Sequence, residues 1–305
     1  MRIVVTGATG TIGRALAEAL TGRGDQVVAL SRDEARGQDA LGSRAEVRAW
    51  AHPTEEPPPA EALAGADAVV NLIGEPIAQR WSDDAKHRIR DSRVRATCQL
   101  VEGLGALPDD QRPGVLVSQS ATGYYGRSDD RPLDETAPVG SDFLAELVLA
   151  WEREALAGPA RMRTVVTRTG VVLSPSGGAL GQMLPFFKLG LGGPVAGGHQ
   201  YVPWIHLDDV VGGIIHCLDG RLDGAVNLTA PNPVTNAELS KALGQALHRP
   251  AVLPVPAFGL KLLYGEMATI VITGQRVIPA ALERDGYRFR HPEVGDALRD
   301  VLGRS

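Results

Sequence analysis

The chain has 305 residues, of which 44% are hydrophobic, and it carries a formal net charge of −5 at pH 7. These values suit a globular protein with a sizeable core, and the acidic balance argues against nucleic acid as a partner. With two cysteines, no basic and apolar leader and no run of about 18 apolar residues, we expect a cytoplasmic protein that has no disulfide framework and no membrane partner.

Short apolar runs alternate with longer helical patterns through the first half of the chain. The runs predict strands over Arg2–Thr6, Gln26–Leu30, Glu46–Trp50, Ala68–Leu72, Gly114–Ser118 and Arg163–Arg168. Helical periodicity predicts helices over Ile12–Gly22, Ser82–Leu107 and Ser141–Leu156. Repeated strand and helix units indicate an α/β fold with a doubly wound parallel Rossmann sheet, whose ligands lie at the carboxyl ends of the strands.

Glycine-rich loops follow the sixth predicted strand, which marks a change of structure. We expect a dinucleotide-binding Rossmann domain over residues 1–173, to which residues 204–226 return. Residues 174–203 and 227–305 are expected to form a smaller C-terminal substrate lobe and C-terminal domain. Within it, Thr235 and Glu238 predict a capped helix start, and that helix is expected to end near His248.

The first strand leads directly into the turn Thr6-Gly7-Ala8-Thr9-Gly10-Thr11-Ile12-Gly13, which opens the first helix. Gly7 permits a tight turn, Gly10 lets the backbone approach phosphates, and Gly13 lets the helix pack on the strand. The start of the helix offers backbone N–H groups to an anion. We therefore predict a dinucleotide pyrophosphate site at Gly7, Thr9, Gly10, Thr11, Ile12 and Gly13.

The end of the second strand predicts which dinucleotide is bound. An NAD site usually has an acidic residue there, which accepts a hydrogen bond from the ribose 2′-hydroxyl, but this sequence has Ser31 followed by Arg32. A hydroxyl and a guanidinium suit the 2′-phosphate of NADP, so we expect NADP to be preferred over NAD. Asp33 and Glu34 would supply the acid if the strand ended two residues later, and Arg32 would then be a solvated charge.

The turn after the fourth strand is the next candidate contact with the cofactor. Backbone amides of Leu72 and Ile73 are expected at the ribose and pyrophosphate, and Gly74 lets the chain pass close to them. Glu75 either binds a ribose hydroxyl or is an exposed acid at a helix start. Ser118, at the end of the fifth strand, is expected at the same edge of the sheet.

The glycine spacing Thr-Gly-x-x-Gly-x-x-Gly resembles the short-chain dehydrogenase/reductase superfamily, in its extended, epimerase-like branch. Further segments are similar to one divergent group of that branch, the SDR39U1 or YfcH-like epimerase type, over nearly the whole chain. These segments are Asn71–Ile77, Arg80-Trp81, Ser92–Val94, Gly123–Gly126, Asp142–Ala145 and Trp204–Asp209. The resemblance implies a nucleotide-binding domain of the epimerase/dehydratase kind and a small C-terminal domain.

The resemblance also implies roles for individual residues. Ser120 takes the place of the serine that hydrogen-bonds the reacting carbonyl, and Arg93 takes the place of an Asn-led motif that faces the active site. Arg93 is therefore expected at the cofactor or at an acidic substrate group, unless it is one of the solvated charges of its helix. Val172 is expected to hold the nicotinamide carboxamide through its backbone. Arg168 lies either beside the nicotinamide or in a structural ion pair, and His206 is expected to anchor a helix start.

The catalytic Tyr-x-x-x-Lys dyad of the superfamily is absent, since none of the five tyrosines is followed by Lys four residues later. The helix that should carry the dyad has apolar residues in those places. Tyr124 and Tyr125 are the nearby phenols, and an unassisted phenol with a pKa near 10 is a poor proton donor at neutral pH. They are candidate catalytic residues with Ser120, or else they pack the pocket wall.

The sequence supports two functions. The first is an NADP-dependent oxidoreductase or epimerase-like enzyme that moves a hydride between the nicotinamide and a small-molecule substrate of unknown identity. The second is a protein that binds NADP(H) without turnover and acts on a partner as a regulatory or interaction protein. No cluster of His, Asp and Glu has metal-ligand spacing in the sequence, so no metal is expected. A homodimer is compatible with the sequence.

Overall fold

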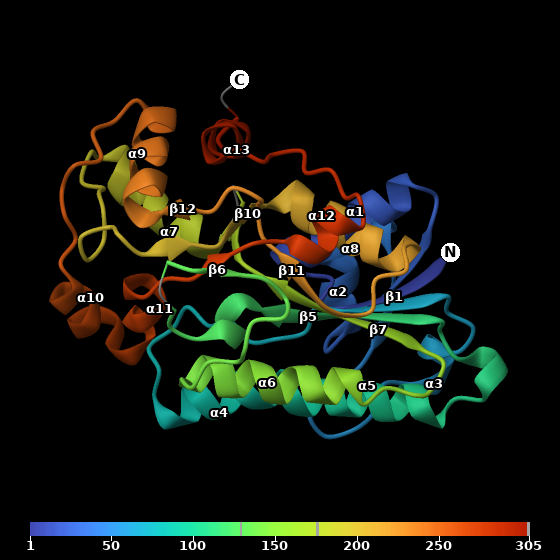
Figure 1. The fold of residues 1–305 in the computed structure, drawn as a ribbon. Coiled ribbons are helices and arrows are strands. Elements are labelled where there is room, and N and C mark those ends of the chain that lie inside the picture. Colours follow the sequence, from blue (N-terminus) through green and yellow to red (C-terminus); the bar gives the residue numbers. More distant parts are fainter. Residues whose placement is uncertain (129, 175–176, 304–305) are drawn as a thin grey trace.

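A seven-stranded parallel sheet forms the centre of the computed structural model, which describes residues 1–128, 130–174 and 177–303 (Figure 1). Its strands are β1 (Arg2–Thr6), β2 (Gln26–Ser31), β3 (Glu46–Ala49), β4 (Ala68–Asn71), β5 (Val115–Ala121), β7 (Arg163–Thr169) and β11 (Gly224–Leu228). The strand order is β11-β7-β5-β4-β1-β2-β3. The order reverses between β1 and β4, and this switch point is where a doubly wound sheet binds its ligand.

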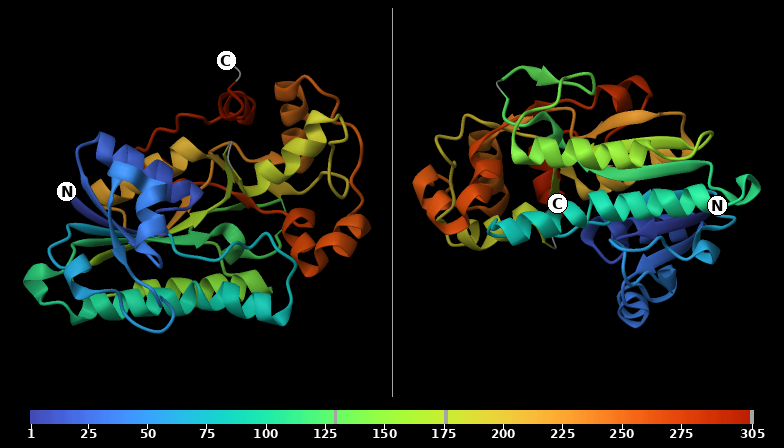
Figure 2. Two further views of the ribbon diagram at one scale, coloured as in Figure 1. Left: turned by 180° about the vertical axis from the view of Figure 1, so that it is seen from behind. Right: turned by 90° about the horizontal axis from the view of Figure 1, so that it is seen from below.

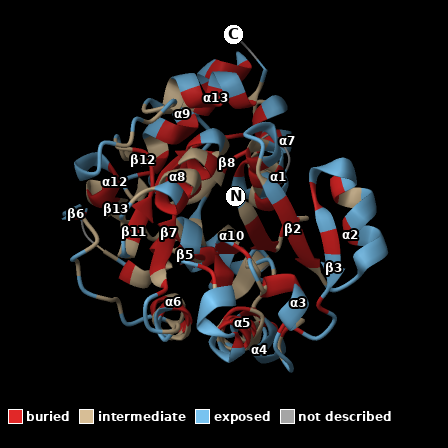
Figure 3. Ribbon diagram, turned by 90° about the vertical axis from the view of Figure 1, so that its right-hand side faces the viewer, coloured by how far each residue is buried: buried red, intermediate tan, exposed pale blue. Residues whose placement is uncertain are grey.

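Helices cover both faces of the sheet (Figures 1 and 2). One face carries α1 (Thr11–Gly22), α2 (Glu34–Leu41) and α8 (Leu207–Asp219), and the other carries α3 (Ala60–Leu63), α4 (Asp83–Asp91), α5 (Val94–Ala106) and α6 (Phe143–Leu156). Alternate residues of one strand reach opposite cores: Ile3 and Val5 pack with α1, whereas Val4 packs with α5. Because both faces are covered, the strands other than the edge strand β3 are buried along most of their length (Figure 3).

The predicted strands are confirmed within a few residues, and α8 packs into the sheet core. The sequence reading did not identify β11 as a strand. It also predicted one helix over Ser82–Leu107, which is wrong: α4 ends at Asp91 and α5 begins at Val94. Ser92 breaks the helix because its hydroxyl accepts a hydrogen bond from Glu75 N (3.0 Å) and donates one to Ile89 O (3.1 Å).

A second, smaller core lies in the predicted lobe, between α7 (Gly178–Lys188), α9 (Asn236–Leu247) and α13 (Val294–Val301). The predicted start of α9 is confirmed, because Thr235 and Glu238 form a reciprocal capping box and His248 ends the helix. Ala281 and Leu282 of α12 (Ala280–Arg284) pack into the sheet core. Pro175, Ser176, Arg304 and Ser305, which fall in the predicted lobe, lie outside the described residues.

Short elements complete the lobe and the rim of the sheet. The strands β6 (Pro132–Leu133) and β13 (Arg276–Val277) pair, as do β8 (Val171–Leu173) with β10 (Trp204–His206), and β9 (Tyr201–Val202) with β12 (Val234–Thr235). The remaining helices are α10 (Ala257–Tyr264), α11 (Thr269–Ile272), and the 3-10 turns η1 (Gly42–Arg44), η2 (Asp109–Gln111), η3 (Thr122–Tyr125) and η4 (Gly265–Ala268).

None of the helices in the described ranges has the length and apolar character needed to cross a bilayer.

Candidate functional site

The glycine turn has the geometry that the sequence predicts. Gly7 has a φ of +66°, and a Cβ on it would lie 2.6 Å from Leu72 O. A Cβ on Gly13 would lie 2.4 Å from Gly7 O, so both positions exclude larger residues. A Cβ on Gly10 would meet a single neighbour within 4 Å, Gly7 O at 3.3 Å, which leaves that side of the turn open.

The N-terminus of α1 opens onto the same side. Gly10 is its N-cap and supplies no side-chain cap to the first turn of the helix. The Thr9 carbonyl is engaged by a side chain of the same segment, because Thr9 O accepts a hydrogen bond from Arg14 Nε at 2.7 Å. Thr11 is exposed and Ile12 is half-buried beside it.

The end of β2 bears on the choice between NADP and NAD. The strand ends at Ser31, and Arg32 is exposed directly after it. Asp33 is the N-cap of α2 and accepts a hydrogen bond from Arg36 N at 3.0 Å. The strand therefore does not extend to place Asp33 at a ribose, and its carboxylate already stabilises a helix start.

Arg93 lies against the turn that follows β4. A Cβ on Gly74 would lie 3.0 Å from Arg93 Cζ, so the glycine makes room for the guanidinium. Nη1 donates to Ile89 O at 3.1 Å, and the guanidinium lies 5.4 Å from the Trp151 ring. The Arg93 side chain is thus packed against the turn and is not one of the solvated charges of the helix surface.

The charge of Arg93 is incompletely balanced. Its side chain is 9% exposed, and among the described residues no carboxylate forms an ion pair with it. Burial lowers the pKa of Arg93 to about 10, and the negative charge of Glu75 acts in the opposite direction. Glu75 itself lies in the turn rather than at a helix start, and it pairs with Arg88 at 3.3 Å. A buried guanidinium in this setting attracts an anion.

Ser118 lies in the middle of β5 rather than at the predicted strand end, and it joins β5 to the ends of β1 and β4. Asn71 Nδ2 donates to Ser118 Oγ at 3.1 Å and to Thr97 Oγ1 at 3.0 Å, and Thr6 Oγ1 donates to Asn71 Oδ1 at 2.7 Å. All four side chains are fully buried. The network fixes β1, β4 and β5 in register beneath the glycine turn, so the structure gives Ser118 a supporting position.

Ser120 binds a residue that the sequence reading did not single out. Its hydroxyl donates to Glu152 Oε1 at 2.6 Å. The same carboxylate accepts from Arg168, with Nε–Oε1 at 2.8 Å and Nη2–Oε2 at 2.9 Å. Of the two alternatives for Arg168, the structure therefore shows the ion pair. Burial lowers the pKa of Arg168, but the hydrogen bonds and charge of Glu152 outweigh it and raise that pKa above its ordinary value.

The two neighbouring tyrosines have different environments. Tyr125 is 4% exposed, and its hydroxyl donates to Asn227 Oδ1 at 2.7 Å and accepts from Arg168 Nη1 at 3.1 Å. Burial raises the pKa of Tyr125 to about 12, although Arg168 and Asn227 act in the other direction. Tyr124 is half-buried, and its ring centroid lies 3.4 Å from Arg168 Cζ. Its hydroxyl makes no hydrogen bond to the described residues.

The place of the missing dyad is apolar, as the sequence predicts. A Cβ on Gly123 would lie 3.3 Å from Leu144 Cβ and 3.7 Å from Val148 Cγ2. These two residues are four apart on α6 and face the turn that carries the tyrosines. One helical turn later the same face presents Glu152, so an acid follows the two apolar residues along this face.

The sequence reading missed Glu152 and Asn227 for different reasons. Glu152 lies in a buried stripe of α6 whose other members, Ala145, Val148 and Ala155, are apolar. A charged residue within an apolar stripe can be recognised from the sequence. Asn227 lies on β11, which was not recognised as a strand. Its side chain also donates to Ile278 O at 2.9 Å, and no local pattern predicts that contact.

His206 caps α8, as the resemblance implied. Its Nδ1 accepts a hydrogen bond from Asp208 N at 3.0 Å. Tertiary structure also gathers His206, Asp208, His291 and Asp300, whose ligand atoms lie within 4.8 Å of one another. The bond to Nδ1 leaves the proton of the neutral ring on Nε2, which faces Asp300 at 3.2 Å. That nitrogen then has no lone pair for a metal.

The glycine turn follows β1 and the turn at Leu72 follows β4, so these two predicted cofactor segments lie at one edge of the sheet. Thr6 and Asn71, which end β1 and β4, are aligned in register with Ser118 in the middle of β5. Val172 is half-buried on β8, outside the central sheet, where a Cβ on Gly178 would lie 3.7 Å from its carbonyl. The start of α7 is close to the glycine turn, since a Cβ on Gly177 would lie 3.8 Å from Thr11 Oγ1.

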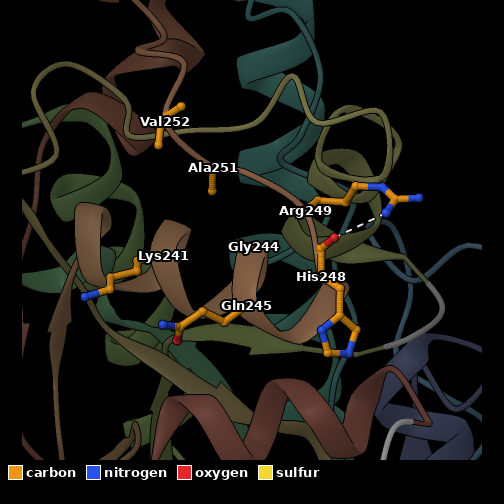
Figure 4. A pocket seen from close by; sticks show the side chains of 7 residues that line it. All are labelled: Lys241, Gly244, Gln245, His248, Arg249, Ala251 and Val252. Carbon is orange, nitrogen blue, oxygen red and sulfur yellow. Dashed lines mark hydrogen bonds between the residues drawn. The ribbon is translucent and has the colours of Figure 1, made fainter.

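An open cavity of about 560 Å³ lies on α9, and none of the predicted cofactor residues is in its wall (Figure 4).

The comparisons with known proteins agree with this arrangement. Residues 3–228 match the NAD dependent epimerase/dehydratase family, and residues 255–301 match a domain of unknown function, DUF1731. The chain is 41% identical to "Epimerase family protein SDR39U1 homolog, chloroplastic" of Arabidopsis thaliana, over 99% of this chain and 87% of that one. It is 37% identical to the human epimerase family protein SDR39U1, over 99% of this chain and all of the human protein.

A solved structure is similar over the whole length. The crystal structure of human SDR39U1 (isoform 2) with NADPH has a TM-score of 0.89 and 36% identity, and the match covers 99% of each chain. The match confirms the predicted resemblance of the sequence to the extended, epimerase-like reductases, and it confirms the predicted Rossmann fold. The chain belongs to the NAD-dependent epimerase/dehydratase family, among the SDR39U1-type epimerase family proteins.

Proposed function

We propose that this protein binds NADP(H) at the carboxyl edge of its sheet and prefers it to NAD(H). The observation that carries the proposal is the end of β2, where the exposed Arg32 directly follows Ser31 and Asp33 is engaged as a helix cap. An acid at this place would repel the 2′-phosphate of NADP(H), whereas a guanidinium attracts it. The NADPH in the similar human structure supports the same choice.

The described residues fit such a cofactor. Gly7 and Gly13 leave no room for a side chain, whereas Gly10 leaves open the side from which a pyrophosphate would approach. The N-terminus of α1 would attract the negative charge of that pyrophosphate. Leu72, Ile73 and Gly74 bring backbone to the same edge, and Arg93 offers a buried positive charge beside them. When bound, NADP(H) would supply a hydride donor or acceptor.

Binding is tested by calorimetric titration of the purified chain with NADPH and, separately, with NADH. We expect saturable binding of NADPH with an affinity at least tenfold higher than that of NADH. The same titration with 2′-phospho-AMP and with AMP isolates the contribution of the phosphate. Equal affinities for NADPH and NADH would contradict the proposed preference.

We infer further that the protein is an oxidoreductase or epimerase-like enzyme for a small molecule, located in the cytoplasm. Tyr124 is the favoured proton-transfer residue, since its hydroxyl makes no bond to the described residues while Arg168 lies over its ring. Tyr125 and Ser120 would instead hold Arg168 and Glu152 in place.

A second candidate function is binding of NADP(H) without turnover, as a regulatory or interaction protein. It is favoured by one observation: the Ser120 hydroxyl is donated to Glu152, and Leu144 and Val148 occupy the face where a dyad would act. In this state Ser120 cannot donate to a substrate carbonyl.

The two functions are separated by NADPH oxidation. Purified protein is incubated with NADPH and a panel of carbonyl compounds and nucleotide sugars, and absorbance of the reduced nicotinamide is followed. Oxidation above that of a Gly10→Val variant supports the enzyme. Tight NADPH binding with no oxidation by any member of the panel favours the binding protein.

A further inference from the structure

Part of the lobe lacks acidic residues. The chain has 36 Asp and Glu, yet none occurs in residues 155–207 and none in residues 239–265. The structure joins these two segments: Leu253 N donates to Gly192 O at 3.3 Å, and Arg249 Nε donates to Lys188 O at 3.1 Å. Their junction is therefore a basic region on an acidic protein.

Large apolar side chains are exposed at this junction. Leu189 is 73% exposed and Val252 is 75% exposed, although apolar residues of this size are usually buried. Phe186, Leu191 and Leu253 are also exposed, and backbone hydrogen bonds hold the two segments together. We call this region the lobe surface; it consists of Phe186, Lys188, Leu189, Leu191, Arg249, Val252 and Leu253.

The cavity of Figure 4 adjoins the lobe surface and shares Arg249 and Val252 with it. Lys241 and His248 flank the same cavity, and none of the residues in its wall is acidic. It has a volume of about 560 Å³ and is open to solvent. Lys188 and Arg249 thus lie beside the exposed apolar side chains, and Lys241 and Arg249 line a cavity that is large enough for a small molecule.

We propose that the lobe surface docks on the face of a bilayer that contains anionic phospholipid. The exposed apolar side chains would enter the boundary between headgroups and acyl chains, and Lys188 and Arg249 would lie beside lipid phosphates. The cavity beside Lys241 and His248 would receive a phosphate headgroup. From the lack of a spanning segment we expected no membrane partner, but docking from one side of a bilayer requires no such segment.

The charge pattern disfavours a second copy of the chain as the occupant. A two-fold contact places the same surface on both sides, so Lys188 and Arg249 would face cations of the other copy. An anionic lipid surface satisfies the cations and the apolar side chains together. The proposal does not depend on the proposed function, since none of the candidate cofactor residues belongs to the lobe surface.

The test is cosedimentation of the full chain with vesicles. One set contains phosphatidylcholine alone, and the other contains equal parts of phosphatidylcholine and phosphatidylglycerol. We expect binding to the anionic set, weakened by high salt because screening reduces the attraction. The variant Lys188→Gln/Arg249→Gln should bind about 25-fold more weakly, about fivefold for each lost cation.

Matched variants show whether position or total charge matters. Arg36→Gln/Arg48→Gln removes the same charge from exposed sites elsewhere and should bind like the wild type. Leu189→Ser/Val252→Ser should lose binding, whereas Leu156→Ser, at a half-exposed leucine outside the surface, should keep it. These changes are at exposed sites, and urea unfolding verifies that each variant is folded.

Three outcomes would overturn the proposal. Equal sedimentation with both vesicle sets would show that anionic lipid is not recognised. Binding to soluble polyglutamate but to neither vesicle set would assign the surface to an acidic protein. A dimer by light scattering that Leu189→Ser/Val252→Ser dissociates, without vesicle binding, would assign it to a second copy.

Discussion

Glu152 and Arg168 form a two-point ion pair, Nε–Oε1 2.8 Å and Nη2–Oε2 2.9 Å, with both side chains almost completely buried. Glu152 lies on α6 and Arg168 on β7, so the pair joins a helix to the sheet next to the candidate site. Ser120 and Tyr125 each bind one member of the pair. The charged network thus lies one helical turn beyond Leu144 and Val148 on the same face of α6.

Removing Glu152 should destabilise the fold strongly. Glu152→Ala leaves the Arg168 guanidinium buried without its partner, which costs about 3–5 kcal/mol. The free energy of unfolding in urea measures the loss. The control is Asp109→Ala, which breaks an exposed pair with Arg112 and should cost less than about 1 kcal/mol. A similar small loss in both variants would show that the buried pair adds no stability.

Gly10→Val should abolish NADPH binding while the protein stays folded. The branched side chain would fill the open side of the turn, where a pyrophosphate would approach. Calorimetry measures the affinity and circular dichroism the fold. Gly13→Val is a contrasting variant, since its Cβ would lie 2.4 Å from Gly7 O and should destabilise the fold itself. Wild-type affinity in a folded Gly10→Val protein would remove the turn from the cofactor site.

Arg32→Ala should weaken NADPH binding without affecting NADH. A hydrogen bond to a charged group contributes about 1.5–3 kcal/mol, so the loss should be roughly ten- to a hundredfold. Titrations with the two nucleotides measure it. Arg36→Ala, one helical turn later and also exposed, is the matched control and should bind both nucleotides normally. Equal weakening of both nucleotides by Arg32→Ala would mean that Arg32 does not recognise the 2′-phosphate.

The two tyrosines should respond differently to loss of the hydroxyl. Tyr124→Phe should lower single-turnover oxidation of bound NADPH by about 10²–10⁴, once a substrate is identified, because positioned proton transfer contributes that factor. Tyr125→Phe should instead lower stability by about 1–3 kcal/mol, because the buried Asn227 loses its hydrogen-bond donor. Stopped-flow absorbance and urea unfolding are the measurements. Wild-type turnover in Tyr124→Phe would assign both rings to the pocket wall.

Stability should fall as pH is lowered below about 6.5, the usual histidine pKa. Burial, and next the charge of His291, lower the pKa of His206 in the folded protein. The unfolded chain then binds a proton that the folded protein does not, so unfolding becomes easier as pH falls from the unfolded pKa toward the folded one.

His206→Asn tests that pH dependence. Asn is a good N-cap, so it can keep the bond from Asp208 N without titrating. The melting temperature between pH 7 and pH 5 should fall less steeply in this variant than in the wild type. Asp208 and Asp300 are present in both proteins, so the comparison isolates the change at His206. Identical slopes would assign the acid sensitivity to other groups.

Local sequence determined much of the cofactor edge. Strand periodicity and glycine positions depend on neighbours within a few residues, and so Gly7, Gly10 and Gly13 have the predicted geometry in the structure. The absence of the Tyr-x-x-x-Lys dyad is also a property of the sequence alone. Whether β2 continued to Asp33 was open in the sequence, and the structure closed that question because Asp33 caps α2.

Only the tertiary structure decided the chemistry around Ser120. Its partner Glu152 is 32 residues away, and Tyr125 and Asn227 are 102 residues apart, so no local pattern specifies these contacts. The break between α4 and α5 likewise follows from a bond between Ser92 and the distant Glu75. Periodicity records which face of an element is buried, but which polar groups meet inside depends on how the layers pack.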